Sequence, residues 1–138
     1  PTYTYTATGT YTVTLTATND LGSSSVSHPV TVQPIAITSV DLAQTSAGPI
    51  FPGDVVEFSA DLLPEDASMP YSYTINFGDG TVISGTSDLD PYPFEHAFTS
   101  FGWHMVQISV WNAGMTEPVT DNLDILVAYK FLLPFTVK

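Results

Sequence analysis

Residues 1–20 read PTYTYTATGTYTVTLTATND, and threonine occupies every even position from Thr2 to Thr18. Successive side chains of a β-strand point to opposite faces, so the apolar residues at odd positions are predicted to share one face and the threonines the other. Threonine is β-branched and suits a strand whose face meets water. Gly9 interrupts the run, and two short strands with a bend near residues 7–9 are therefore expected.

The composition of all 138 residues favours the same kind of structure. Hydrophobic residues make up 43% of the chain, which is enough for a buried core. Eleven prolines and nine glycines favour short strands and turns, and no stretch has the apolar spacing of an amphipathic helix. An all-β fold is predicted. The absence of cysteine excludes disulfides and a cysteine-based zinc site.

The charge of the chain is one-sided. Fourteen acidic residues stand against two lysines, Lys130 and Lys138, and no arginine, which gives a formal charge of −12. Such a chain repels phosphate backbones, so nucleic acid is not an expected partner. No apolar run is long enough for a membrane helix, so no membrane span is expected. Because the chain starts at Pro1 without a signal peptide or an initiating methionine, it is expected to be a mature fragment or a piece of a longer protein.

A repeat becomes visible when Gly9 is aligned with Gly102, an offset of 102 − 9 = 93 positions. The apolar positions then agree without a gap, whereas the positions between them do not. The matched pairs are Tyr3 with His96, Tyr5 with Phe98, Val13 with Val106, Leu15 with Ile108, Ala17 with Val110, Asn19 with Asn112, Val30 with Leu123 and Val32 with Ile125.

The repeat predicts three segments. Residues 1–33 are expected to form the C-terminal half of a domain, residues 34–128 a complete domain, and residues 129–138 an apolar tail strand. Within the complete copy, the alternating segments between turn signals predict a β-sandwich of seven or eight strands. The expected strands are 34–43, 55–63, 71–77, 81–85, 94–98, 103–111 and 119–127, with residues 86–93 as a connection.

Four motifs of the complete copy resemble the PKD domain, the immunoglobulin-like module of polycystin and of many microbial surface proteins. They are the Asn-Phe-Gly-Asp-Gly segment at 76–80, His-Ala-Phe at 96–98, Gly102, and an aliphatic strand that ends at Asn112. The resemblance implies an immunoglobulin-like, PKD-type β-sandwich. The sequence departs from the family pattern at four positions, where Ile75 replaces Trp, Asn76 replaces Asp, Phe98 replaces Tyr and Tyr3 replaces His.

These motif residues are expected to stabilise a fold. Gly78 and Gly80 can adopt positive φ, and Asp79 can accept hydrogen bonds from nearby amides, which closes a tight hairpin. Phe77 is expected in the core, and His96 is expected to find a backbone or carboxylate partner. The structural set is Phe77, Gly78, Asp79, Gly80, His96, Phe98, Gly102 and Asn112.

No constellation of residues predicts catalysis. The three histidines, His28, His96 and His104, are scattered, and the serines at 23–25 near His28 lack a Gly-x-Ser-x-Gly elbow. The chain is therefore not expected to be an enzyme.

Calcium is the only cofactor that the sequence brings into consideration. Calcium prefers several loop oxygens, and some PKD-like modules bind it, so Asp79, Asp88 and Asp90 are a candidate site. The alternative is that these residues lie in solvated acidic loops.

The threonine face allows three interpretations. It is either an exposed polar sheet surface, a site of O-linked glycans, or a flat surface laid against another chain. The equivalent outward positions of the second copy are Trp103, Met105 and Trp111, which predict an interface covered by another part of the domain or by a partner.

The tail alternates Phe131, Leu133, Phe135 and Val137 on one side. Added to the open sheet of another copy, it would build a head-to-tail polymer. The alternatives are that it folds back on its own domain or acts as a sorting or anchoring signal.

Taken together, these features predict a non-catalytic structural or adhesive module of an extracellular surface or filament-forming protein. Its partners would be other copies of itself or neighbouring domains, and glycans are a further candidate. The alternative is an accessory module of a secreted hydrolase that binds a polysaccharide or fibrous protein through Trp103, Trp111, Tyr71 and Tyr92.

Overall fold

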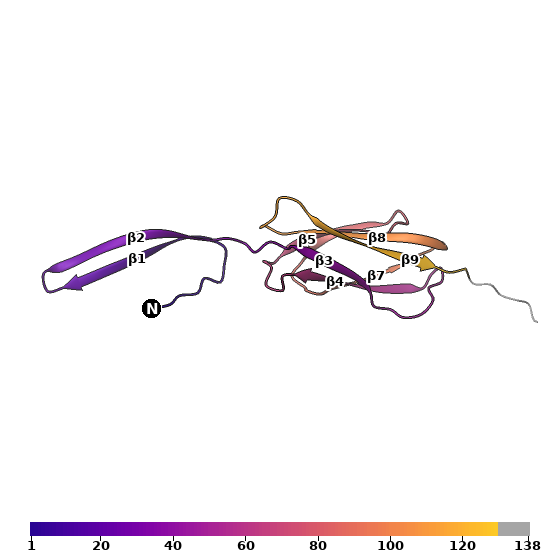
Figure 1. Cartoon of the computed structure of the whole chain (residues 1–138), viewed down its shortest axis with the longest axis horizontal. Helices are drawn as coiled ribbons and strands as arrows, with labels where there is room; N and C mark the ends of the chain where they lie inside the picture. Colours follow the sequence, from indigo (N-terminus) through magenta and orange to yellow (C-terminus); the bar gives the residue numbers. More distant parts are fainter. Residues whose placement is uncertain (130–138) are drawn as a thin grey trace, which may run out of the picture. The chain divides into compact units, whose positions relative to one another are not determined.

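A computed structural model describes residues 1–129, which contain nine strands and no helix. The chain forms two compact units, an N-terminal unit, Pro1–Pro34, and a C-terminal unit that begins at Ile35 (Figure 1). Within residues 1–129 no helix could cross a membrane. The strands are β1 (Gly9–Asn19), β2 (Gly22–Val32), β3 (Ser39–Gln44), β4 (Val55–Leu63), β5 (Tyr71–Asn76), β6 (Val82–Ser87), β7 (Tyr92–Ala97), β8 (Gly102–Trp111) and β9 (Val119–Val127).

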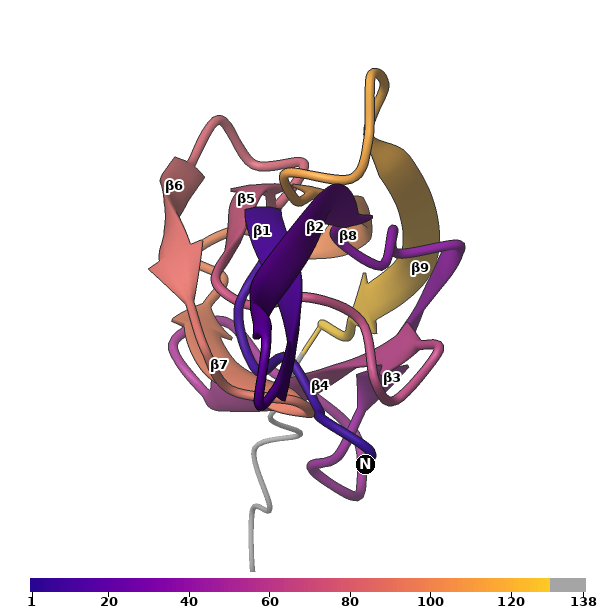
Figure 2. The ribbon, with the colours of Figure 1, turned by 90° about the vertical axis from the view of Figure 1, so that its left-hand side faces the viewer.

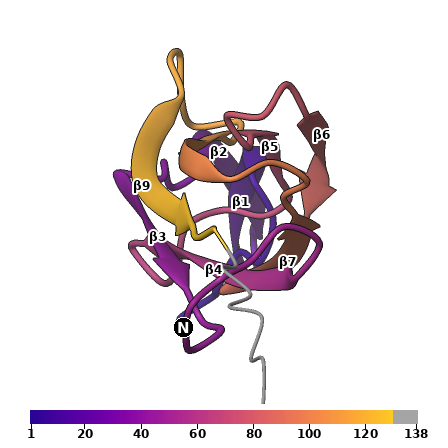
Figure 3. The same ribbon diagram turned by 90° about the vertical axis from the view of Figure 1, so that its right-hand side faces the viewer.

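The C-terminal unit is a sandwich of two antiparallel sheets. One sheet has the strand order β3-β4-β7, and the other has the order β6-β5-β8-β9. Figures 2 and 3 view the strands from opposite ends, and in Figure 3 the two sheets form separate layers with the core between them. The predicted all-β, immunoglobulin-like sandwich is confirmed.

The core lies between the two sheets and follows from the alternation in each strand. In β4, Val56, Phe58, Ala60 and Leu62 are buried while the residues between them face outward. The same period places Val106, Ile108 and Val110 of β8 in the core. The largest fully buried side chains include Tyr71, Phe58, Phe77, Phe98, Leu62 and Ile75.

Two boundaries differ from the prediction. The expected connection at 86–93 is shorter, because β6 continues to Ser87 and β7 begins at Tyr92. Pro93 belongs to β7, which pairs only with β4, so its missing N–H removes no ladder bond on the other side. The first strand of the C-terminal unit, β3, begins at Ser39 rather than at residue 34.

The N-terminal unit is a single antiparallel hairpin of β1 and β2. Of the two short strands expected on either side of a bend near residues 7–9, the first is wrong, because no strand is present before Gly9. With the offset of 93, residues 2–4 correspond to residues 95–97 of β7, which pairs with β4. The N-terminal unit contains no counterpart of β4, so residues 1–8 have no strand to pair with.

The β1–β2 and β8–β9 hairpins share their faces but differ in register. Gly9 lies opposite Val32, whereas Gly102 lies opposite Val127. The offset carries Val32 to position 32 + 93 = 125, so the second hairpin is shifted by 127 − 125 = 2 residues. A two-residue loop joins β1 to β2, and a longer one joins β8 to β9. A shift of two keeps every side chain on its own face.

Candidate functional site

The turn between β5 and β6, residues 77–80, packs directly against β8. Gly78 and Gly80 have φ of 74° and 98°, in the left-handed region that favours glycine. A Cβ on Gly78 would lie 2.6 Å from the carbonyl oxygen and 2.9 Å from the nitrogen of Met105. The backbone of β8 therefore approaches Gly78 so closely that no side chain fits there.

Asp79 and His96 join the turn to strand β7 of the other sheet. Asp79 Oδ2 lies 2.7 Å from His96 Nε2, and Asp79 Oδ1 accepts a 2.9 Å hydrogen bond from the amide of Thr81. The imidazole stacks on Phe77 with ring centroids 3.9 Å apart. Partial burial raises the pKa of the Asp79 carboxyl, but the hydrogen bonds from His96 and Thr81 outweigh it and lower the pKa to about 2.

A second histidine, His104, packs inside the core. His104 is buried, stacks on Phe98 at 4.8 Å, and donates through Nε2 to the carbonyl oxygen of Ser100 at 3.1 Å. Its Nδ1 is buried without a hydrogen-bond partner. Gly102 begins β8 with φ of 121°. One ring nitrogen of His104 is therefore bonded to the backbone, and the other is buried.

Asn112 closes the sandwich at the end of β8. Its side-chain amide donates to the carbonyl oxygens of Ile35 at 2.8 Å and Ser68 at 2.9 Å, and its Oδ1 accepts from the amide of Gly114 at 3.0 Å. This buried residue therefore joins three segments far apart in sequence, which explains an asparagine at the end of an aliphatic strand.

The candidate calcium ligands do not form a site. Asp79 is engaged with His96, Asp90 accepts a 2.9 Å hydrogen bond from the amide of Leu62, and Asp88 is exposed. Among residues 1–129 no group of three or more acidic, histidine or cysteine side chains could hold a metal ion. The expected site at Asp79, Asp88 and Asp90 therefore does not fit calcium.

Acidic side chains serve the fold in a way that the sequence did not reveal. Asp121 accepts a 2.8 Å hydrogen bond from the amide of Leu42, and Asp90 accepts one from the amide of Leu62. These contacts span 79 and 28 sequence positions, so no local motif marks them.

Two tyrosines of the expected sugar-binding set use their hydroxyls inside the C-terminal unit. Tyr71 is buried and donates to the carbonyl oxygen of Leu89 at 2.8 Å. Tyr92 is half-buried and donates to the hydroxyl of Tyr73 at 2.7 Å. Because the ring of Tyr71 is buried, the expectation that it stacks on a ligand is wrong, whereas the expectation for the half-buried Tyr92 stays a prediction.

The outer face of β8 and β9 carries an exposed apolar patch of Trp103, Met105 and Leu126. Their side chains are 70%, 54% and 48% exposed. Trp103 and Leu126 lie directly opposite each other across the two strands. No part of residues 35–129 covers this outer patch, in which the expected interface residues Trp103 and Met105 share one face of β8.

Trp111 does not belong to the outer patch. It lies eight positions beyond Trp103 on the same strand, and Gln107 and Ser109 separate it from Met105 on that face. A cavity of about 270 Å³ lies beside it and is lined by Trp111, Met115, Thr116, Glu117 and Pro118. The tail residues Phe131, Leu133, Phe135 and Val137 lie outside the described residues.

The outer face of the other sheet is acidic. Asp41 of β3 lies directly opposite Asp61 of β4, and Glu57 of β4 lies directly opposite Glu95 of β7. All four side chains are exposed. The two outer surfaces of the C-terminal unit thus differ sharply in chemistry.

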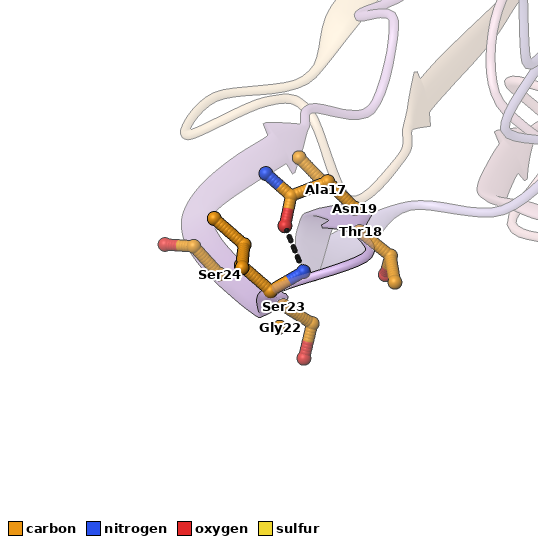
Figure 4. A pocket seen from close by; sticks show the side chains of 7 residues that line it. Ala17, Thr18, Asn19, Gly22, Ser23 and Ser24 are labelled. Atoms are coloured by element: carbon orange, nitrogen blue, oxygen red, sulfur yellow. Dashed lines mark hydrogen bonds between the residues drawn. The ribbon is translucent and has the colours of Figure 1, made fainter.

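The hairpin of the N-terminal unit offers no catalytic arrangement. Ser23 and Ser25 of β2 lie opposite threonines on the polar face, whereas His28 lies opposite Val13 on the apolar face. A hollow of about 500 Å³ at the hairpin tip is lined by Leu21 and by small and polar residues (Figure 4). There Asn19 Oδ1 accepts a 2.9 Å hydrogen bond from the amide of Leu21.

Comparison with known proteins supports the fold and the family. The family model for the PKD domain matches residues 1–32 and 42–121. The chain resembles the solution structure of the PKD domain of the human VPS10 domain-containing receptor SorCS2, with a TM-score of 0.61, 19% identity, and coverage of 72% of this chain and 80% of that one.

It also resembles the PKD domain of an M14-like peptidase from a Thermoplasmatales archaeon, with a TM-score of 0.52, 16% identity, and coverage of 70% of this chain and 99% of that one. At these identities the two structures support the fold alone. No curated protein matches the chain. The family model covers most of the sequence, and the chain therefore belongs to the PKD domain family, whose members are in general non-catalytic, immunoglobulin-like structural and binding modules.

Proposed function

We propose that this chain is a structural and adhesive module of an extracellular surface or filament-forming protein. The observation that carries the proposal is the outer patch of Trp103, Met105 and Leu126, which faces solvent on β8 and β9. Tryptophan and methionine are enriched in protein interfaces, and exposed apolar clusters of this kind mark sites of association. The occupant of the patch would be a neighbouring module or another copy of the chain.

The polar side chains of the C-terminal unit support a structural role. Asp79 and His96 bind each other, His104 is buried, and Asn112 holds three backbone segments. These polar side chains, which include two of the three histidines, are thus engaged in stabilising the fold. The tail strand with Phe131 and Phe135 remains a candidate for donation between copies, because its alternation suits addition to an open sheet edge.

The test replaces two residues of the outer patch by the residues at the equivalent positions of the first copy of the repeat. The equivalents of Trp103 and Met105 are Thr10 and Thr12, so the Trp103→Thr/Met105→Thr variant keeps strand-forming residues. We expect sedimentation velocity to show self-association of the parent chain that is reduced at least tenfold in the variant, about 1.4 kcal/mol per tenfold change. The control Gln107→Thr, on the same face, should associate like the parent. Equal association of parent and double variant would refute the proposal.

A second candidate is an accessory binding module of a secreted hydrolase. It is favoured by the likeness to a PKD domain taken from a peptidase and by the exposed Trp103 and Trp111. Exposed tryptophan rings can stack on sugars or on fibrous protein. Retention on chitin, cellulose or collagen that is lost in Trp103→Thr or in Trp111→Thr would favour this candidate, whereas passage of the parent chain through all three would exclude it.

A further inference from the structure

The β1–β2 hairpin has two unlike faces. On one face, hydroxyls pair across the strands, Thr10 with Thr31 at 3.2 Å, Thr14 with Ser27 at 2.8 Å and Thr16 with Ser25 at 2.7 Å. The other face is apolar and exposed, and carries Val13, Leu15, Val26 and Val30. An isolated two-stranded hairpin is marginally stable in water. A hairpin so clearly divided is built to place its apolar face against another layer.

The segment before β1 already has an ordered aromatic arrangement. Tyr3 meets Tyr5 edge-on with ring centroids 4.9 Å apart and an interplanar angle of 72°. Tyr5 stacks on Tyr11 at 4.4 Å and 29°. The hydroxyl of Tyr11 donates to the carbonyl oxygen of Ala7 at 2.8 Å.

The C-terminal unit contains the same arrangement 93 positions later. His96 meets Phe98 edge-on at 4.7 Å and 86°, and Phe98 stacks on His104 at 4.8 Å and 25°. His104 donates to the carbonyl oxygen of Ser100, the equivalent of Ala7, at 3.1 Å. Two ring contacts and one hydrogen bond are therefore reproduced with different side chains. The N-terminal unit has the local geometry of the second half of a sandwich.

The C-terminal unit shows what covers such a half. Residues 35–93 supply its first half, in which β5 pairs with the edge of β8, with Ile75 opposite Ile108. The turn at 77–80 lies under the aromatic segment, where Phe77 stacks on His96 and Asp79 binds it. The equivalent edge of β1 and the equivalent apolar face have no such cover within residues 1–34.

Counting the halves excludes two sources of that cover. Each chain carries two second halves, residues 1–32 and 94–128, but only one first half, residues 35–93. If one copy lent its first half to the β1–β2 hairpin of another copy, its own β8–β9 hairpin would lose that cover. Exchange between copies therefore cannot cover all the hairpins. The tail, residues 129–138, is long enough for one strand and cannot replace both a paired edge strand and an opposing sheet.

We infer that the apolar face of the β1–β2 hairpin binds the first half of a PKD sandwich, a polypeptide segment with the chemistry of residues 35–93 that lies outside residues 1–138. Its β5-like strand pairs with the free edge of β1. Its Gly-Asp-Gly turn lies under Tyr3, whose hydroxyl donates to the turn carboxylate as His96 does to Asp79. This interface is separate from the outer patch, so it stands or falls independently of the proposed function.

The experiment supplies such a segment to the whole chain. A second copy of residues 35–93 is fused ahead of Pro1, which is the equivalent of position 94 because 94 − 93 = 1. Amide hydrogen exchange of residues 10–32 is then compared with that of the parent. We expect exchange in the hairpin to slow by about 100-fold or more, because the amides join a cooperative unit. Leu15→Asp in the fusion should remove this protection and leave the C-terminal unit unchanged.

A second fusion guards against a mismatch of core side chains. In it, Tyr3, Tyr11 and Ala17 are changed to their counterparts, Tyr3→His, Tyr11→His and Ala17→Val. Fast hairpin exchange in both fusions would overturn the inference, and protection only in the converted fusion would overturn the assigned chemistry. Hairpin protection that is already present in the parent would also overturn the inference. If dilution removes that protection, the occupant is a second copy of the chain; if deletion of residues 130–138 removes it, the occupant is the tail.

Discussion

At the scale of single residues, the fold depends on polar groups that act between the two sheets. The Asp79–His96 pair links the β5–β6 turn to β7 across 2.7 Å, with the imidazole packed on Phe77. The family resemblance predicted the turn and left the partner of His96 open between backbone and carboxylate. The structure assigns the carboxylate of Asp79. The role of Asp121 could not be predicted, because its partner, the Leu42 amide, lies 79 positions away.

The pH dependence of unfolding tests the Asp79 pair. The pKa of Asp79 falls from 3.8 to about 2 in the folded state, so the unfolded chain binds the proton more tightly. The stabilisation is therefore fully present above about pH 5 and is lost as the pH falls from about 5 toward 2. We expect Asp79→Asn to lower the free energy of unfolding by about 2 kcal/mol at pH 6. The free energies of unfolding of the parent and of Asp79→Asn should converge near pH 2.

The parent and Asp79→Asn must be compared because other carboxyl groups of the chain titrate in the same pH range. Asp88→Asn, at an exposed position of the loop after β6, serves as the control and should follow the parent at every pH. Chemical denaturation at several pH values measures all three. A gap between parent and Asp79→Asn that stays constant down to pH 2 would contradict the assigned role.

At the scale of elements, the alternation of apolar and polar residues predicted most strands, whereas pairing required knowledge of the neighbours. Residues 2–4 alternate as β1 does, yet they form no strand, because residues 1–34 contain no partner strand for them. Their equivalents in the repeat, residues 95–97, belong to β7, which pairs with β4. Alternation therefore indicates which side chains share a face, and the available partner decides whether a strand forms.

Shortening a side chain to alanine should change the free energy of unfolding differently at equivalent positions of the two hairpins. Leu15 and Ile108 occupy the same place in the repeat, but Leu15 is 67% exposed and Ile108 is 0% exposed. We expect Ile108→Ala to cost about 2–5 kcal/mol of unfolding free energy, because it leaves a cavity in the core. Leu15→Ala should cost less than about 0.5 kcal/mol in the same chain. Urea denaturation measures both, and equal losses would show that the Leu15 face is already covered.

At the scale of the whole molecule, charge is the dominant property. All fourteen acidic residues and neither lysine lie within residues 1–129, so acidic side chains repel one another with few cations to offset them. The repulsion is strongest where like charges face each other, at Asp41–Asp61 and Glu57–Glu95. The net charge was evident from composition, but the opposed pairs appear only once the register is known.

Salt should therefore stabilise the protein. We expect the melting temperature to rise by about 5 °C or more between 10 mM and 1 M sodium chloride, because the screening length falls from about 30 Å to about 3 Å. Glu95→Lys, which converts an opposed pair into an attractive one, should raise the melting temperature at low salt and reduce its salt dependence. Scanning calorimetry measures both, and a melting temperature independent of salt in the parent would contradict the expectation.

The contrast between the two outer faces of the C-terminal unit also gives the molecule a direction. An acidic sheet on one side and an uncovered tryptophan on the other mean that two such modules cannot stack acidic side to acidic side without a counterion layer. In any array of these modules, each module would therefore have the same orientation. The apolar contacts would lie along one side of the array, and a hydrated surface that attracts cations would lie along the other.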